Sequence, residues 1–158
     1  MSIRRDIGLF IPNGYTFFDL IVEQDDFLTD LGLETAIAIS LFSDQRITLQ
    51  EIPDGEVTRK GWWGDMFPTA EGDKIGSKLW IYRRRKRTNE TRLAIIQAAK
   101  DSLAWLIEDG VAKSVVVNGE FFGENALGQI GLTIDIERSN GPAAKYSVIW
   151  DSQGVRRA

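Results

Sequence analysis

Apolar and polar residues alternate most regularly between residues 130 and 137. Every second residue is apolar there, and the residues between them are small or polar. The apolar positions are Ile130, Leu132, Ile134 and Ile136. A period of two predicts a strand with one face in the core and one face toward solvent.

Further strand-like segments stand on both sides of this one. Residues 111–117 precede it across a glycine-containing loop at 118–129, and residues 144–150 follow a turn at 139–142. Short connections favour pairing between consecutive strands. We therefore expect an antiparallel β-meander in the C-terminal third of the chain.

A long helix is predicted before the meander, where apolar residues recur at spacings of three and four. Thr88 or Asn89 can cap its start, Glu90 complements the helix dipole, and Asp109 with Gly110 can end it. The face predicted to be buried consists of Leu93, Ile96, Ala99, Leu103 and Leu106. Packed on the meander, this helix gives an α+β fold.

The N-terminal third predicts one more strand and one more helix. Residues 15–22 are aromatic and β-branched, which favours a strand. Residues 33–42 fit a helix that Thr29 or Asp30 could cap, but they also alternate as a strand would, so both states stay open. A turn is expected at 53–55.

The pattern contains one hydrophobic core and no internal repeat, so we expect a single small domain over 1–158. Its core would cover about 15–150, and residues 151–158 would form a polar tail.

Residues 58–78 lack any period and surround the sequence Gly61-Trp62-Trp63-Gly64-Asp65. Long irregular loops in compact domains are usually functional or disordered, and paired tryptophans argue against disorder. The tryptophans either fold back onto the chain's own core or anchor a partner protein, since tryptophan is common in both settings. Trp62, Trp63 and Asp65 are therefore candidate contact residues.

A basic block follows this loop. Trp80 precedes it closely, and the block itself consists of Arg83, Arg84, Arg85, Lys86 and Arg87. A solvated charge run and a nucleic-acid site are both possible interpretations of such a block. We favour pairing with carboxylates of neighbouring subunits, because guanidinium groups suit bidentate contacts. Trp80, the five cations and Trp150 of the last predicted strand complete the candidate interface.

Charge is distributed unevenly along the 158 residues. The net charge is −4. Residues 1–57 carry −8, residues 58–92 carry +6, and residues 93–158 carry −2. Such polarity favours oriented contacts with other charged surfaces. The acidic remainder of the chain argues against a nucleic-acid-binding module, because such modules usually have a broad basic surface.

Cysteine and histidine are both absent. Disulfides, thiolate metal sites and the commonest general base are thereby excluded, and we expect no cofactor. A carboxylate-dependent cell-wall glycoside hydrolase remains a less favoured alternative, because it needs only two acids. Its candidate residues are Glu34, Asp44, Asp65 and Glu108.

No apolar run approaches the roughly 20 residues needed to cross a bilayer, and residues 7–11 are too short for the core of a signal peptide. The sequence therefore predicts a soluble, unexported protein with no membrane contact.

The order of several short motifs resembles the baseplate protein of Mu-like contractile-tailed bacteriophages. The motifs are the acidic strand, residues 32–44, Gly61-Trp62-Trp63-Gly64-Asp65, residues 76–80, and a helix ending at residues 104–112. The resemblance covers roughly residues 15–150. Each motif alone is weak, whereas the ordered set is specific.

This Mu-like family is similar to the wider group of wedge and sheath-initiator proteins of contractile tails. The resemblance implies a non-enzymatic structural protein of the virion tail baseplate, assembled in multiple copies in the host cytoplasm. It implies other wedge proteins and the tail sheath as partners, with tube proteins as further candidates, and it implies no contact with nucleic acid. An open sheet edge would accept sheath strands. The wider group's Glu-Pro-Arg is not intact here, because the corresponding residues 105–109 read Trp-Leu-Ile-Glu-Asp.

Overall fold

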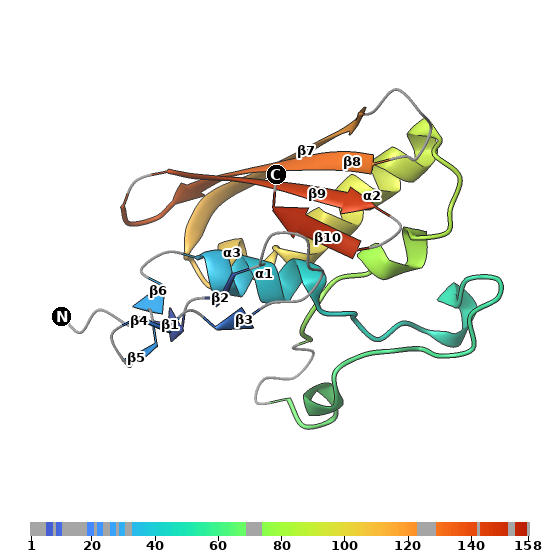
Figure 1. Ribbon diagram of the computed structural model, residues 1–158, viewed down its shortest axis with the longest axis horizontal. Helices are drawn as coiled ribbons and strands as arrows, with labels where there is room; N and C mark the ends of the chain where they lie inside the picture. Colours follow the sequence, from blue (N-terminus) through green and yellow to red (C-terminus); the bar gives the residue numbers. More distant parts are fainter. Residues whose placement is uncertain are drawn as a thin grey trace.

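In the computed structural model, helices cover one face of an antiparallel sheet (Figure 1). The backbone is described for residues 6–7, 9–10, 19–20, 22–23, 26–27, 29–30, 33–68, 74–122, 129–141, 143–151 and 154–157. Side chains are described within 33–68, 74–121, 130–141 and 143–148.

The sheet contains four strands in the order β10-β9-β8-β7, all antiparallel to their neighbours. Their bounds are β7 Ala112–Phe122, β8 Gln129–Arg138, β9 Ala144–Asp151 and β10 Gly154–Arg157. The predicted meander is confirmed. Strand β7 continues five residues beyond the predicted end at 117.

The predicted tail contains β10, whose backbone pairs with β9. The sequence analysis predicted no strand in this polar tail, because Gly154-Val155-Arg156-Arg157 has no apolar alternation.

Strand β8 has the two faces that its alternation predicts. Ile130, Leu132, Ile134 and Ile136 are buried on the helix side. Leu132 lies opposite Gly119 of β7 and Val148 of β9, so the core face continues across the meander.

The predicted long helix is two helices, α2 Asn89–Ser102 and α3 Trp105–Glu108. Thr88 caps α2, since its hydroxyl accepts a hydrogen bond from the amide of Thr91 at 3.1 Å. The amide of Leu103 donates to the carbonyl of Lys100, an i to i−3 bond that tightens the last turn and ends α2. Gly110 follows α3, as predicted.

The buried face of α2 differs from the predicted one. Ile96, Ala99, Leu103 and Leu106 are buried, whereas Leu93 is 53% exposed. Ile95, Ala98 and Thr91 take the buried positions in the first half of α2. The prediction for Leu93 is therefore wrong, because Leu93 lies two residues before buried Ile95, about 200° around the helix, and so on its opposite side.

Residues 33–42 are helical, as α1 Glu34–Phe42. Ile37 and Leu41 enter the core, while Ile39 is exposed, so the spacing of four describes this segment and the spacing of two does not. Leu33 occupies the N-cap position without a side-chain cap. The predicted caps are wrong, because Thr29–Asp30 forms strand β6.

The described residues before α1 form two-residue strands that pair antiparallel as β1 with β6, β2 with β3, and β4 with β5. Their bounds are β1 Asp6–Ile7, β2 Leu9–Phe10, β3 Asp19–Leu20, β4 Val22–Glu23, β5 Asp26–Phe27 and β6 Thr29–Asp30. The single strand predicted at 15–22 is corrected within its described part, where β3 and β4 belong to different pairs. Residues 15–18 and 21 lie outside the described residues.

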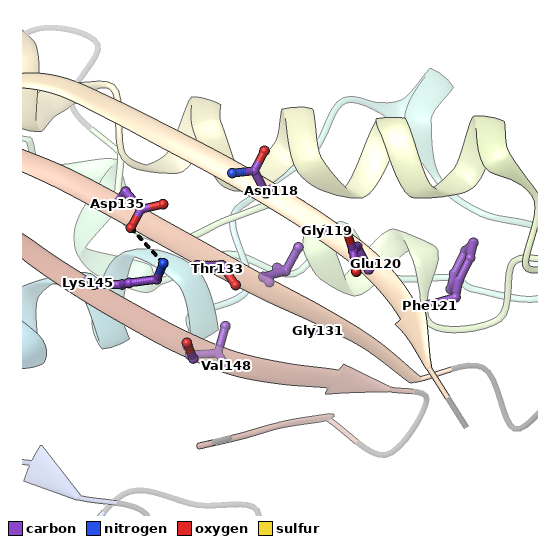
Figure 2. A pocket seen from close by; sticks show the side chains of 11 residues that line it. Asn118, Gly119, Glu120, Phe121, Gly131, Thr133, Asp135, Lys145 and Val148 are labelled. Carbon is purple, nitrogen blue, oxygen red and sulfur yellow. Dashed lines mark ion pairs between the residues drawn. The ribbon is translucent and has the colours of Figure 1, made fainter. Parts of the chain in front are cut away.

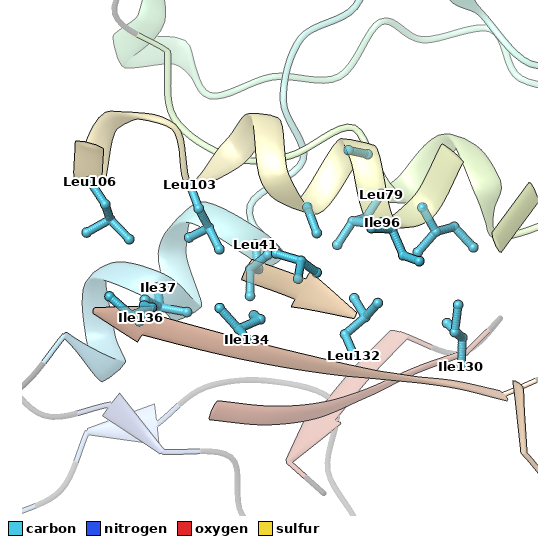
Figure 3. Packing of buried hydrophobic residues seen from close by; sticks show 14 of the residues in the cluster. Ile37, Leu41, Leu79, Ile96, Leu103, Leu106, Ile130, Leu132, Ile134 and Ile136 are labelled. Carbon is cyan, nitrogen blue, oxygen red and sulfur yellow. The ribbon is translucent and has the colours of Figure 1, made fainter. Parts of the chain in front are cut away.

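Side chains from three layers meet in the core (Figure 3). α1 contributes Ile37 and Leu41, the α2 and α3 segment contributes Ile96, Leu103 and Leu106, and β8 contributes its apolar face. At the edge of the core, the indole Nε1 of Trp105 donates to the hydroxyl of Ser40 at 3.0 Å and ties α3 to α1.

A long segment joins α1 to α2, and its described residues, 43–68 and 74–88, contain no α-helix or named strand. These residues form the short 3₁₀ helices η1 Leu49–Glu51, η2 Trp63–Met66 and η3 Leu79–Tyr82. The predicted turn at 53–55 is confirmed, because the amide of Glu56 donates to the carbonyl of Pro53 at 3.0 Å. Within the described part of the chain, no helix combines the length and apolarity required to cross a membrane.

Candidate protein interface

The segment from Ser43 to Lys78, which we call the arm, leaves the core and returns beside its own start (Figure 1). The amide of Ser77 donates to the carbonyl of Ser43 at 2.9 Å, and the amide of Gln45 donates to the carbonyl of Ser77 at 3.0 Å. These bonds close the base of the arm, so its outer part is presented by a fixed stem.

Trp80 belongs to this stem. It is 5% exposed, and its indole Nε1 donates to the carbonyl of Gln45 at 2.9 Å. The ammonium of Lys60 lies 4.7 Å above its ring and pairs with Asp44 at 2.7 Å. Trp80 is therefore a structural residue, and we remove it from the candidate contact residues because a partner cannot reach it.

Two glycines shape the tryptophan pair. Gly61 has φ of 100°, and a Cβ there would lie 2.5 Å from the Cβ of Arg46. A Cβ on Gly64 would lie 2.1 Å from the ring of Trp62, so this ring packs directly on the glycine backbone. The rings of Trp62 and Trp63 are 5.4 Å apart and tilted by 48°.

The two tryptophans differ in exposure as a result. Trp62, seated on Gly64, is 46% exposed, and Trp63 is 70% exposed. The interpretation in which this pair plugs the chain's own core is wrong, because neither ring is buried. Met66 and Phe67 are exposed beside them. We call Trp62, Trp63, Met66 and Phe67 the tryptophan surface.

Asp65 points inward from the same short helix. Its Oδ1 accepts a hydrogen bond from the amide of Ile75 at 3.2 Å. The carboxylate therefore holds the returning half of the arm, and its first role is to position the tryptophan surface.

The basic block divides into paired and exposed cations. Arg83 pairs with Asp44 at 3.6 Å, and Arg87 is partly buried. Arg84, Arg85 and Lys86 are exposed. The middle of the block is therefore its most exposed part, while Arg83 and Arg87 are partly buried, which gives a smaller basic surface than the sequence suggested.

Trp150 lies outside this region. Its backbone belongs to β9, opposite Ile130 of β8 and Val155 of β10. Its side chain lies outside the described residues.

A groove of about 470 Å³ runs between the tryptophan surface and the start of the arm. Trp62, Trp63 and Met66 form its apolar wall. Its charged lining consists of Arg46, Arg59, Lys74, Lys78, Glu51 and Asp65. The four cations were missed by sequence analysis, because they are scattered from residue 46 to residue 78 and only the fold of the arm brings them together.

Glu51 is the most strongly perturbed acid in the groove. Its Oε1 accepts from the ammonium of Lys78, and its Oε2 accepts from the amide and the hydroxyl of Thr48, each at 2.9 Å. The bond from Lys78 first, and those from Thr48 second, lower the pKa of Glu51 from 4.5 to about 2. Glu51 is therefore ionised at neutral pH and holds η1 in a capping box.

This shift predicts a defined pH dependence. Because the pKa is lowered in the folded chain, Glu51 stabilises it above pH 4.5 and loses that contribution as the pH falls toward about 2. In an NMR titration, the side-chain carboxyl of Glu51 should titrate near its lowered pKa, and Lys78→Ala should raise the midpoint. A wild-type midpoint at the ordinary value would contradict the geometry.

Gly64→Ala should displace Trp62, because the added methyl would overlap its ring. We expect altered tryptophan fluorescence and weaker partner capture, with cooperative thermal unfolding retained, since the site lies outside the core cluster. The control is Val57→Ala, which shortens a 90% exposed side chain of the same arm that lies away from the tryptophan rings. Unchanged fluorescence in Gly64→Ala would show that the ring does not rest on the glycine.

The four acids considered for glycoside hydrolysis lie on different elements and make different contacts. Asp44 is paired with Lys60 and Arg83, and Asp65 holds the arm. Glu34 and Glu108 lie at the surface on α1 and α3. Across the described ranges, no group of three or more acidic residues is arranged to hold a metal ion.

The sheet face away from the helices contains a shallow hollow of about 680 Å³ (Figure 2). Gly131 leaves space between Glu120 of β7 and the neighbouring β9. Lys145 pairs with Asp135 across the hollow at 3.4 Å. Its lining of Asn118, Thr133 and Ser147 is polar, which suits a solvated face.

Comparisons with known proteins agree with the extent of this fold. Residues 33–143 match the family described as "Phage protein GP46". The chain is 35% identical over 116 residues to "Baseplate protein gp46" of Escherichia phage Mu, covering 73% of this chain and 77% of that protein. It is 41% identical over 112 residues to "Mu-like prophage FluMu protein gp46" of Haemophilus influenzae (strain ATCC 51907 / DSM 11121 / KW20 / Rd), covering 71% and 73%. The matched family region begins just before α1 and runs through the arm, α2, α3, β7 and β8 to residue 143.

Proposed function

The chain belongs to the Phage protein GP46 family of Mu-like baseplate proteins, and from this premise we propose that it is a non-enzymatic structural component of a contractile-tail baseplate. It serves as a wedge protein that helps to initiate the sheath. It acts in multiple copies in the virion tail, after assembly in the host cytoplasm.

The tryptophan surface carries this proposal. Phe67 and Trp63 are 77% and 70% exposed, and Met66 lies between them. Exposed aromatic clusters of this kind mark protein contacts, and tryptophan is enriched among the residues that dominate binding energy. The closed base of the arm supports presentation of this surface to another wedge protein.

The basic block supports a second contact in the same assembly. Arg84, Arg85 and Lys86 are exposed directly after η3. Carboxylates of a neighbouring subunit suit these groups, and the arginines can form bidentate pairs.

The sheath contact uses an open strand edge. The order β10-β9-β8-β7 leaves β7, with 11 residues, at one edge of the sheet. Arg92 of α2 guards this edge, since its Nη1 donates to the carbonyl of Gly119 at 2.9 Å. Asn89 Oδ1 accepts from Nε and Nη2 of Arg92 and holds the guanidinium in place. A sheath strand that pairs along β7 would displace this bond, so the guard keeps free subunits from pairing with one another.

Arg92→Ala should therefore increase strand addition at β7. We expect more capture of sheath protein and more self-association, because the carbonyl of Gly119 loses its partner. Sedimentation of the variant and co-precipitation with sheath protein measure the two effects. Lys113→Ala is the matched control, since it removes a cation from the exposed end of the same strand. A loss of sheath capture in Arg92→Ala would contradict this role.

The wedge assignment is tested by expressing the tagged chain with the adjacent tail genes. We expect wedge or sheath proteins to be recovered, with recovery reduced when residues 83–87 become serine or when Trp63 becomes alanine. Ile107→Ala serves as a control, because it removes an exposed apolar side chain from α3.

Two results would contradict the proposal. Recovery of nucleic acid alone, lost with the basic block and steeply dependent on salt, would favour a nucleic-acid-binding module. Cell-wall cleavage abolished by one carboxylate substitution would show a hydrolase.

A further inference from the structure

We propose that the groove beside the tryptophan surface binds an acidic peptide segment that carries an aromatic side chain, supplied by another protein of the baseplate. This inference rests on the proposed function and specifies the chemistry of one partner. The occupant follows from the shape of the groove, its apolar wall and its surplus of positive charge.

The groove has rigid walls. On one side, the amide of Ile47 donates to the carbonyl of Arg59 at 3.1 Å, and Nε of Arg59 donates back to the carbonyl of Ile47 at 2.6 Å. On the other side stands η2, held by the bond from Ile75 to Asp65. Ligand pockets in proteins measure about 300–1,000 Å³, so a volume of about 470 Å³ suits one or two side chains of a peptide.

The apolar wall favours an aromatic side chain. Trp62 is fixed on Gly64, and Trp63 is tilted by 48° against it with most of its ring exposed. A partner ring can pack edge-to-face on Trp63, the arrangement that aromatic pairs prefer. Because the ring of Trp62 already packs on Gly64 in the free chain, this side chain loses little conformational entropy when a peptide binds.

The charges favour carboxylates beside that ring. Four cations and two acids line the groove. Glu51 pairs with Lys78, which cancels one charge of each sign. Arg46 and Arg59 donate to backbone carbonyls, and these bonds leave their charges uncompensated. Lys74 is exposed at the rim. Among the described residues that line the groove, Asp65 is the other acid, so these residues keep a positive surplus.

Nucleic acid is the less favoured occupant. Stacked bases would suit the tryptophans, but successive phosphates would need a continuous basic track. Glu51 and Asp65 interrupt such a track within this groove. An acidic peptide places its few carboxylates at separate points and fits the mixed lining.

The test uses a fluorescein-labelled peptide, Gly-Asp-Glu-Phe-Asp-Glu-Gly, and the full chain in fluorescence anisotropy. One control peptide replaces its acids with lysine, a second replaces its phenylalanine with serine, and a single-stranded oligothymidylate replaces the peptide. We expect saturable binding of the acidic aromatic peptide alone, weakened by salt because surface charges are screened.

Variants locate the site. Trp63→Ala and Lys74→Glu should each weaken peptide binding by at least about tenfold, as expected for a hot-spot aromatic and for reversal of a rim charge. Lys100→Glu makes the same charge change at an exposed position of α2, and it should alter peptide affinity by less than about twofold. Circular dichroism confirms that each variant is folded.

Several outcomes would overturn the inference. These are equal binding of either control peptide, tighter binding of oligothymidylate, or no effect of Trp63→Ala and Lys74→Glu. Self-association of the wild type that Trp63→Ala abolishes would identify a second copy as the occupant and would also overturn it. If co-expression still recovers wedge proteins while no peptide binds, the groove inference fails and the baseplate role stands. Peptide binding without recovery of any tail protein would instead refute the baseplate role.

Discussion

Leu103→Ala should lower the free energy of unfolding by about 2–5 kcal/mol, whereas Leu93→Ala should lower it by less than about 1 kcal/mol. The apolar repeat places both leucines on one helix face, so this pair tests where the structure departs from the pattern. Leu103 is fully buried at the break between α2 and α3, and Leu93 is 53% exposed.

The difference follows from the two environments. Truncating Leu103 removes buried methyl groups and leaves a cavity among side chains of α1, α2 and β8. Truncating Leu93 removes atoms that are already half in water, and alanine favours the helix slightly more than leucine does. Urea unfolding followed by circular dichroism measures both values. Equal losses for the two variants would mean that Leu93 is as buried as Leu103, and would contradict the structure.

Trp63→Ala should reduce capture of wedge partners at least about tenfold, with the free energy of unfolding changed by less than about 0.5 kcal/mol. Trp63 is largely exposed and lies outside the core cluster, so its removal costs the free subunit little. In a complex, the same ring would be buried against the partner, and its loss would remove that burial.

Quantitative co-precipitation with the adjacent tail proteins measures this effect, and thermal unfolding of the free chain provides the stability comparison. Ile107→Ala is the matched variant, because it also truncates an exposed apolar side chain on a helix. Equal capture by both variants would show that exposure of the tryptophan surface has no part in assembly. Unfolding of Trp63→Ala would show that the ring is structural.

Sequence patterns correctly predicted those features that depend only on residues close together in the sequence. The alternation in β8 and the cap at Thr88 correspond to the structure, because a strand exposes every second residue and an N-cap acts within three residues. The meander was also predicted correctly, because short connections between consecutive strands are likewise a local feature of the sequence.

The apolar pattern gave wrong or open predictions where packing against residues distant in sequence decides the structure. The sequence left open whether residues 34–42 form a helix or a strand. The helix α1 is the state that places both Ile37 and Leu41 in the core. Leu93 lies off the buried face because Thr91, Ile95 and Ala98 form that face of α2, and Leu93 is on the opposite side of the helix. β10 carries no periodic signal, because Gly154-Val155-Arg156-Arg157 has no apolar alternation, and only its backbone pairing with β9 reveals it.

The candidate interface shows the same division. The sequence indicated the paired tryptophans and the basic block as contact residues, and it grouped Trp80 with them. In the structure, the indole of Trp80 is hydrogen-bonded to the carbonyl of Gln45 across the base of the arm. It offered no sign of the groove, whose cations come from separate stretches of the arm.

The sequence by itself determined the α+β class, the resemblance to Mu-like baseplate proteins and the segment in which the exposed aromatics lie. These properties depend on periodicity, composition and the order of short motifs, all of which are present in the unfolded chain. Only the tertiary structure decided that Trp63 faces solvent while Trp80 is buried, and that Arg92 donates a hydrogen bond to Gly119 on the edge strand β7. Exposure and edge protection depend on which distant segments pack together, because hydrogen bonds such as those from Trp80 to Gln45 and from Arg92 to Gly119 exist only after the chain has folded.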